Sequence, residues 1–230
     1  MKASDIMVPK VVTIGPNASL RDVANLLLSN GISAVPVVAD DGKLLGIVSE
    51  GDLMRRAETG TERRHSWWLK MFATNEELAA EFVKSHARKV TDVMTRNVIT
   101  ATSGMPIGDI ASLLEKNGIK RVPIVKDGKV IGIVSRANLL QALASAAQET
   151  GTQRRAADSA VREKVEAQLN AQPWTKPWQL NVIVRDGTVE LWGVVHSRIE
   201  KTAARIAAEE VPGVRAVKDN LLVWPEVSGT

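Results

Sequence analysis

With 230 residues, 44% of them hydrophobic and 24% charged, the chain has an ordinary globular composition and room for one to three domains. The absence of cysteine excludes disulfides and thiolate metal sites. The formal charge is only +4, and basic residues are interleaved with acidic ones, so nucleic acid is not indicated as a partner. No apolar run approaches the ~18 residues of a membrane span, and the N-terminus lacks the apolar core of a signal peptide. We therefore expect a cytoplasmic protein.

One short sequence occurs twice, as GIVSEGDL at residues 46–53 and as GIVSRANL at residues 132–139. Each copy is a run of mostly β-branched residues that stops at a serine, with Asp52 or Asn138 three residues later. This pattern predicts a buried strand that runs into the first turn of a helix. Such a turn exposes backbone N–H groups that attract anions, but the same pattern is also a plain capping box. Two binding positions and two well-capped helices are both open interpretations.

The similarity extends well beyond this sequence, in register, with one residue deleted at a hairpin turn. Residues 4–7, 11–13, 20–31 and 32–38 correspond to residues 91–94, 98–100, 107–118 and 119–125. Such agreement indicates an internal duplication. Each unit reads β-α-β-β-α, and about 50 residues are too few to bury both faces of its elements. We expect the two units to pack on each other about a pseudo-two-fold axis, in an α+β fold.

Three features of the repeat carry a resemblance to a known family. They are the Asp-x-Met opening, the Gly-Ile-x-x-Val-Pro-Val/Ile-Val segment, and Gly-Ile-Val-Ser-x-x-Asp/Asn-Leu. Residues 1–57 and 88–147 each resemble a CBS domain, and the two together resemble a Bateman module. The resemblance implies that an adenosine nucleotide (AMP, ADP or ATP) binds in clefts between the paired units and that its occupancy is passed to a partner domain. It also implies a homodimer formed through the CBS pair.

The resemblance assigns roles to residues of the first repeat. Thr13 ends the first strand and would face ribose or phosphate, while Val35 and Pro36 would offer backbone groups to adenine. Ser49 would lie near phosphate. Asp52 would accept hydrogen bonds from both ribose hydroxyls, a role that suits a carboxylate because it only accepts.

The second repeat differs in its charges. Its corresponding residues are Thr100, Lys120, Arg121, Val122, Pro123, Ser135, Arg136 and Asn138. The basic residues among these have no counterpart in the first repeat, which has Ser33, Ala34 and Glu50 instead. The first site therefore has the better ribose acceptor, and the second has the better charge for phosphate. We favour the second site for a charged nucleotide.

An insert at residues 58–87 separates the two repeats. It is polar at first and then contains Trp67 and Trp68 near the only two phenylalanines of the chain. One interpretation is a small apolar cluster that covers the surface of the pair. The other is a docking patch for the C-terminal domain, a second subunit or a membrane face.

A linker is expected at residues 148–155, and a new pattern follows at residues 156–224, before a tail at residues 225–230. A helix capped by Asp158 or Ser159 precedes two alternating strands joined by an Asp-Gly turn, and then come a second helix and a last strand. This α-β-β-α-β order, with glycines at 187, 193 and 213, resembles the BON domain. Gly193 lies in mid-strand, which suggests a bulge or a close backbone approach.

The BON resemblance implies binding to phospholipid or a membrane surface. Trp174 and Trp178 flank Lys176 and could anchor the domain at a lipid interface, or they could be partly buried residues at its edge.

The sequence contains no phosphate-binding glycine loop, no histidine cluster and no recognisable nucleophile, so we expect no enzyme. We expect a regulatory protein whose CBS pair binds an adenosine nucleotide and modulates the BON domain or a partner. The alternative is a dimerisation and interaction module whose BON domain binds phospholipid or protein, with no nucleotide ligand.

Overall fold

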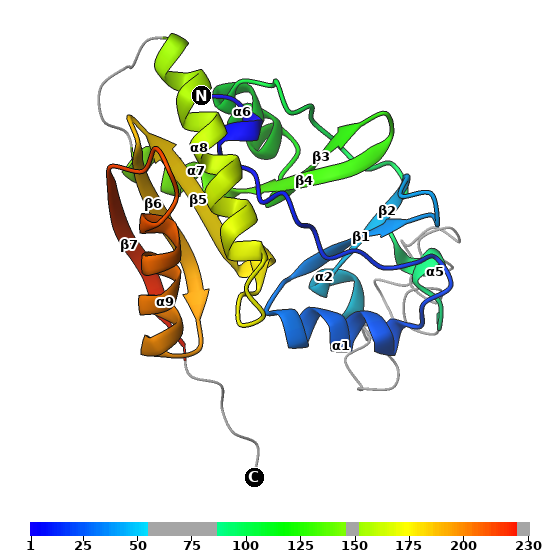
Figure 1. Cartoon of the computed structure of the whole chain (residues 1–230). Helices are drawn as coiled ribbons and strands as arrows, with labels where there is room; N and C mark the ends of the chain where they lie inside the picture. Colours follow the sequence, from blue (N-terminus) through cyan, green and yellow to red (C-terminus); the bar gives the residue numbers. More distant parts are fainter. Residues whose placement is uncertain (55–86, 146–151, 225–230) are drawn as a thin grey trace. The chain divides into compact units, whose positions relative to one another are not determined.

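The computed structural model describes residues 1–54, 87–145 and 152–224, whose elements are shown in Figure 1. Backbone contacts divide the chain into two units. One contains residues 12–99 and 127–130, and the other contains residues 1–11, 100–126 and 131–230. The insert with Trp67 and Trp68 lies outside the described residues, except for Ala87.

The two repeats form corresponding elements. The first contains η1 (Ala3–Asp5), α1 (Leu20–Asn30), β1 (Ala34–Val38), β2 (Leu44–Ser49) and α2 (Glu50–Leu53); the second contains α5 (Val90–Val93), α6 (Ile107–Lys116), β3 (Arg121–Lys126), β4 (Lys129–Ser135) and α7 (Arg136–Ala144). Strands β1 and β2 pair antiparallel, and β3 pairs with β4. The duplication that the sequence predicts is confirmed in this common order of elements.

The predicted first strand of each repeat is reduced to a single parallel bridge. Ile14 N donates to Pro36 O (3.0 Å), and Val38 N donates to Ile14 O (2.9 Å). The next bond of a parallel ladder would need an N–H at Pro36, which proline lacks. Ala101 makes the same pair of hydrogen bonds beside Pro123. The parallel ladder of the second repeat therefore ends for the same reason.

The opening segment of each repeat packs on the last strand of the other. A Cβ placed on Gly132 would lie 2.5 Å from Met7 Sδ, and one placed on Gly46 would lie 2.6 Å from Met94 Sδ. Val8 likewise bridges to β4 within one unit, and Thr95 bridges to β2 within the other. The Asp-x-Met opening and the glycine of the repeated motif are therefore two sides of one contact.

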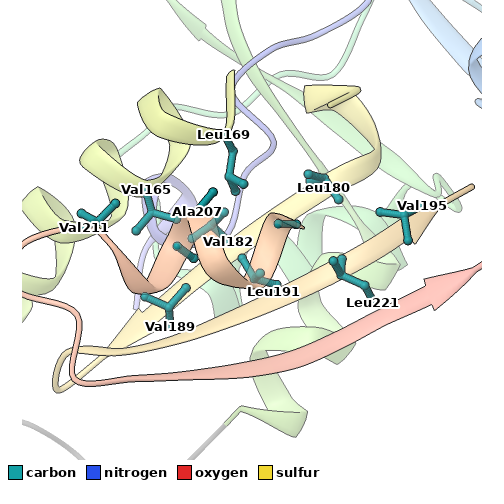
Figure 2. Packing of buried hydrophobic residues seen from close by; sticks show 12 residues of the cluster. Val165, Leu169, Leu180, Val182, Val189, Leu191, Val195, Ala207, Val211 and Leu221 are labelled. Carbon is teal, nitrogen blue, oxygen red and sulfur yellow. The ribbon is translucent and has the colours of Figure 1, made fainter. Parts of the chain in front are cut away.

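The C-terminal residues form a separate layered domain. It contains α8 (Thr152–Asn170), η3 (Pro177–Gln179), β5 (Leu180–Arg185), β6 (Thr188–Val195), α9 (Arg198–Glu209) and β7 (Ala216–Val223). Strand β6 lies in the middle, antiparallel to β5 and parallel to β7. Figure 2 shows how side chains of both helices pack on one face of this sheet; among them are Val165, Leu169, Val182, Val189, Leu191, Ala207 and Leu221. The expected α-β-β-α-β order is confirmed.

The expected start of the first helix is wrong. Helix α8 begins at Thr152, inside the segment predicted as a linker, because the residues before 158 are good helix formers. Asp158 does not cap this helix. Its carboxylate oxygens accept hydrogen bonds from Asp186 N and Gly187 N, both at 2.9 Å, so that it closes the β5–β6 turn instead.

Gly193 makes the close backbone approach that the sequence suggested. Its φ is +134°, and an added Cβ would lie only 1.9 Å from Gln179 O. We predict that Gly193→Ala destabilises the domain by roughly 1–3 kcal/mol or more, because both strain and a backbone clash oppose the side chain. Thermal unfolding measures this effect. Gly108→Ala is the matched control, because nothing lies within 4 Å of that position; equal stability of both variants would contradict the prediction.

Glu166 gives a pH-dependent prediction. Burial raises the pKa of its carboxyl, against the opposing effect of Arg162, whose Nε donates to Oε1 at 2.8 Å. A carboxyl with a raised pKa in the folded state favours folding while protonated, and this contribution is lost as the pH rises through that pKa. We expect Glu166→Gln to gain stability relative to the wild type as the pH rises from about 4, near the ordinary pKa of a glutamate, through the raised pKa of the folded state. Denaturant unfolding at several pH values in this range tests the prediction. A free energy of unfolding that changes with pH in the same way in both proteins would contradict it.

Candidate functional site

The turn of the first repeat joins β2 to α2 at Ser49. Asp52 Oδ2 accepts hydrogen bonds from Ser49 N (2.9 Å) and from Ser49 Oγ (2.8 Å), which is the backward half of a capping box. Asp52 Oδ1 accepts no hydrogen bond from any residue that the structure describes. The cap therefore uses one carboxylate oxygen of this half-buried side chain, and the other has no partner among the described residues.

The other candidate residues of the first repeat lie on the same small sheet. Thr13 is exposed and precedes the bridge to β1, and β1 pairs with β2 so that Ala34 is opposite Ser49. The side chains of Val35 and Pro36 are buried. The Pro36 carbonyl accepts one hydrogen bond, from Ile14 N. The structure thus brings Thr13, the start of β1 and the Ser49 turn together.

The second repeat builds the same turn with a different result. Asn138 Oδ1 accepts hydrogen bonds from Ser135 N and Ser135 Oγ, both at 2.8 Å. Its Nδ2 donates to Gln141 Oε1 (3.3 Å), and the residue is only 5% exposed. Both ends of the Asn138 amide are therefore engaged, whereas Asp52 keeps one oxygen.

The cationic residues of the second repeat gather at the ends of two adjacent strands. Arg136 N donates to Lys120 O (3.0 Å), and the side chains of Lys120 and Arg136 are both exposed. Arg121 is half-buried, and Val122 and Pro123 are buried beside it. Thr100 is half-buried next to the bridge that Ala101 makes. This arrangement keeps the positive charge expected for phosphate at the second turn.

The two tryptophans of the C-terminal loop are both partly buried. Trp174 packs against the hydrophobic core, and Trp178 is half-buried. Lys176 Nζ lies 3.2 Å from His196 Nε2. In the described parts of the chain, no helix is both long and apolar enough to cross a membrane, and no three acidic or histidine side chains gather as a metal site.

Sequence reasoning missed three polar residues that are central to the C-terminal unit: Gln141, Asn181 and Glu190. Asn181 and Glu190 are each only 5% exposed. They occupy polar positions of alternating strands, which the pattern assigns to solvent. No signal in the sequence shows that another helix covers that face.

Comparisons with known proteins agree with this architecture. The CBS domain family model matches residues 3–58 and 90–145, and the BON domain model matches residues 157–225. The uncharacterized protein MJ1426 of Methanocaldococcus jannaschii is 40% identical over 154 residues, which are 62% of this chain and 91% of that protein. The chain belongs to the CBS domain family, with a CBS pair followed by a BON domain.

Two further similarities concern one plant protein. The chloroplastic CBS domain-containing protein CBSX2 of Arabidopsis thaliana is 29% identical over 154 residues, which cover 64% of this chain and 65% of CBSX2. A crystal structure of CBSX2 in complex with AMP matches with a TM-score of 0.56 and 29% identity, over 64% of this chain and 99% of that one.

The hydrogen bonds of Asp52 predict different effects for two substitutions at this position. Asp52→Ala removes the acceptor for the backbone and hydroxyl of Ser49 and should destabilise the protein by about 1 kcal/mol. Asp52→Asn should have little effect on stability, because Asn138 makes the same two bonds in the second repeat. Chemical denaturation measures both variants, and an equal loss in both would show that the charge, not the cap, matters to folding.

Proposed function

We propose that this is a non-catalytic regulatory protein of the cytoplasm whose CBS pair binds an adenosine nucleotide and modulates the BON domain or a partner. The crystal structure of CBSX2 with AMP supports an adenosine ligand, because CBSX2 is similar to this chain in sequence and in fold. AMP is accordingly the first nucleotide to test.

The single observation that carries the site is the Oδ1 atom of Asp52. A carboxylate only accepts hydrogen bonds, and vicinal ribose hydroxyls are donors that a single carboxylate can serve together. The cap holds the side chain in place through Oδ2, so binding ribose requires no new rotamer. Thr13 precedes the bridge to one side of β1, and Ser49 is paired with Ala34 on its other side, so both are candidates to contact the rest of the nucleotide.

The second repeat supports phosphate better than ribose. Its exposed cations, Lys120 and Arg136, suit an anion. Asn138 is only 5% exposed and its Nδ2 already donates one hydrogen bond to Gln141, so its amide is less accessible to a ligand than the half-buried carboxylate of Asp52. We therefore place AMP in the first repeat, although charge alone favoured the second.

Isothermal titration with AMP, ADP and ATP tests this proposal. We expect Asp52→Asn to weaken AMP binding by at least about tenfold, because a hydrogen bond to a charged acceptor is lost while the cap remains. Asn138→Ala serves as the comparison and should change AMP affinity less.

Unchanged affinity in Asp52→Asn would remove the ribose site from the first repeat. The absence of binding heat with all three nucleotides in the wild type would instead overturn the adenosine ligand itself.

We also propose that the protein forms a homodimer, and exposed apolar side chains of α7 favour this. Leu140 is 66% exposed and Leu143 is 71% exposed, one turn apart on the same helix. Leu140→Glu together with Leu143→Glu should convert the dimer to a monomer in light scattering coupled to gel filtration. A wild type that is monomeric at all concentrations would contradict this proposal.

A further inference from the structure

The sheet of the BON domain has a second face that is also buried. Leu180 and Val182 point to the core, so the alternating residues Asn181 and Ile183 lie on the opposite face, with Glu190 beside Ile183. Ile183 is only 1% exposed, and Asn181 and Glu190 are each 5% exposed. Some other part of the same unit must therefore cover this face.

The cover is α7, the last helix of the second CBS repeat. Asn181 Nδ2 donates to Gln141 Oε1 (2.6 Å), and Ser145 Oγ donates to Glu190 Oε2 (2.6 Å). Both bonds join residues 40 or more positions apart in the sequence. The first lies in the middle of the helix and the second at its C-terminal end, so the contact runs along α7 and is not confined to a point.

Two arginines of the BON domain strengthen this contact. Arg185 Nη2 donates to Ala142 O (3.0 Å), within α7. Arg162 is 6% exposed and donates to the backbone carbonyls of Ser4 and Met7, in the opening segment of the chain. Buried charges are tolerated when they are paired or hydrogen-bonded, and these partners lie outside the BON domain. The BON side chains thus suit a docked state.

Helix α7 also carries the candidate ribose residue of the second repeat. Gln141 Oε1 accepts from Asn181 Nδ2 and from Asn138 Nδ2, so one oxygen links the BON sheet to the second turn. Because Asn138 is only 5% exposed, a ribose could reach its amide only if the residues of this shared arrangement moved.

We propose that the BON domain, docked on α7, keeps the second CBS repeat closed to ribose, so that docking and nucleotide binding at that repeat compete. This inference rests on the proposed nucleotide function. The docked state is also releasable, because two of its buried atoms, Asn181 Oδ1 and Arg185 Nε, have no hydrogen-bond partner in the described structure. Competition of this kind is reciprocal: a ligand at the second repeat releases the BON sheet, and release opens the repeat.

The test uses the full chain and the variant Ser145→Asp. This substitution sets a new carboxylate against Glu190, an arrangement that is unfavourable when buried and harmless when the domains separate. Peptide-level hydrogen exchange over residues 136–144 should become about tenfold faster or more. In titration, the wild type should bind a single AMP per chain, and Ser145→Asp should bind a second.

Three further variants separate the contact from general effects. Asn181→Asp, at the other end of the contact, should behave like Ser145→Asp. Lys164→Ala, on an exposed position of α8, should behave like the wild type. Adding Glu190→Gln to Ser145→Asp should restore slow exchange and single-site binding, because the new amide can donate to the aspartate.

Each outcome decides the proposal. Exchange that is unchanged in Ser145→Asp would overturn docking, and faster exchange without a second AMP would overturn the competition. If neither protein binds AMP, the nucleotide function and the competition both fail, while faster exchange still supports docking. If AMP binds Ser145→Asp but not the wild type, the first-repeat assignment fails and the competition stands.

Discussion

Both repeats depend on the same small constraint, the need for a side-chain oxygen to close the junction between their last strand and last helix. Asp52 and Asn138 meet it in the same way, each with one oxygen that accepts from the backbone and hydroxyl of the preceding serine. What distinguishes the repeats is the remaining atom of each side chain. In Asp52 it is an acceptor without a partner among the described residues, and in Asn138 it is a donor bound to Gln141. The capping and binding interpretations of the motif are thus compatible.

This difference separates charge from geometry in the second repeat. The cations at positions 120 and 136 are exposed and suit an anion. Asn138, the residue expected to bind ribose, is instead buried and hydrogen-bonded to Gln141. Electrostatic reasoning from sequence can rank sites for phosphate, because the charged residues can be identified from the sequence. It cannot show that Gln141, the hydrogen-bond partner of Asn138, also accepts a hydrogen bond from Asn181 of the BON sheet.

Much of the fold follows from patterns that the sequence displays. The duplication, the alternating strands and the Asp-Gly turns identify both kinds of domain, and Gly193 marks a real backbone approach. Other features depend on contacts that no local pattern contains. The predicted start of α8 is wrong because Asp158 resembles a helix cap but accepts hydrogen bonds from the β5–β6 turn. Asn181 and Glu190 resemble solvent-facing strand residues but face α7. Proline at position 36 does carry a signal, since it predicts where the first-strand ladder must stop.

The opening segments, each of which packs on the last strand of the other repeat, also govern how the chain folds during synthesis. The core of the first repeat includes Val90, Val93 and Met94, so that repeat is incomplete until the ribosome has made the start of the second. The contact of Met7 forms later still, because it requires the strand that contains Gly132. Among the described residues, by contrast, the core between the BON sheet and its two helices uses only residues between 161 and 221. The first half of the protein must therefore remain partly unassembled while more than a hundred residues emerge, whereas its last domain can close at once.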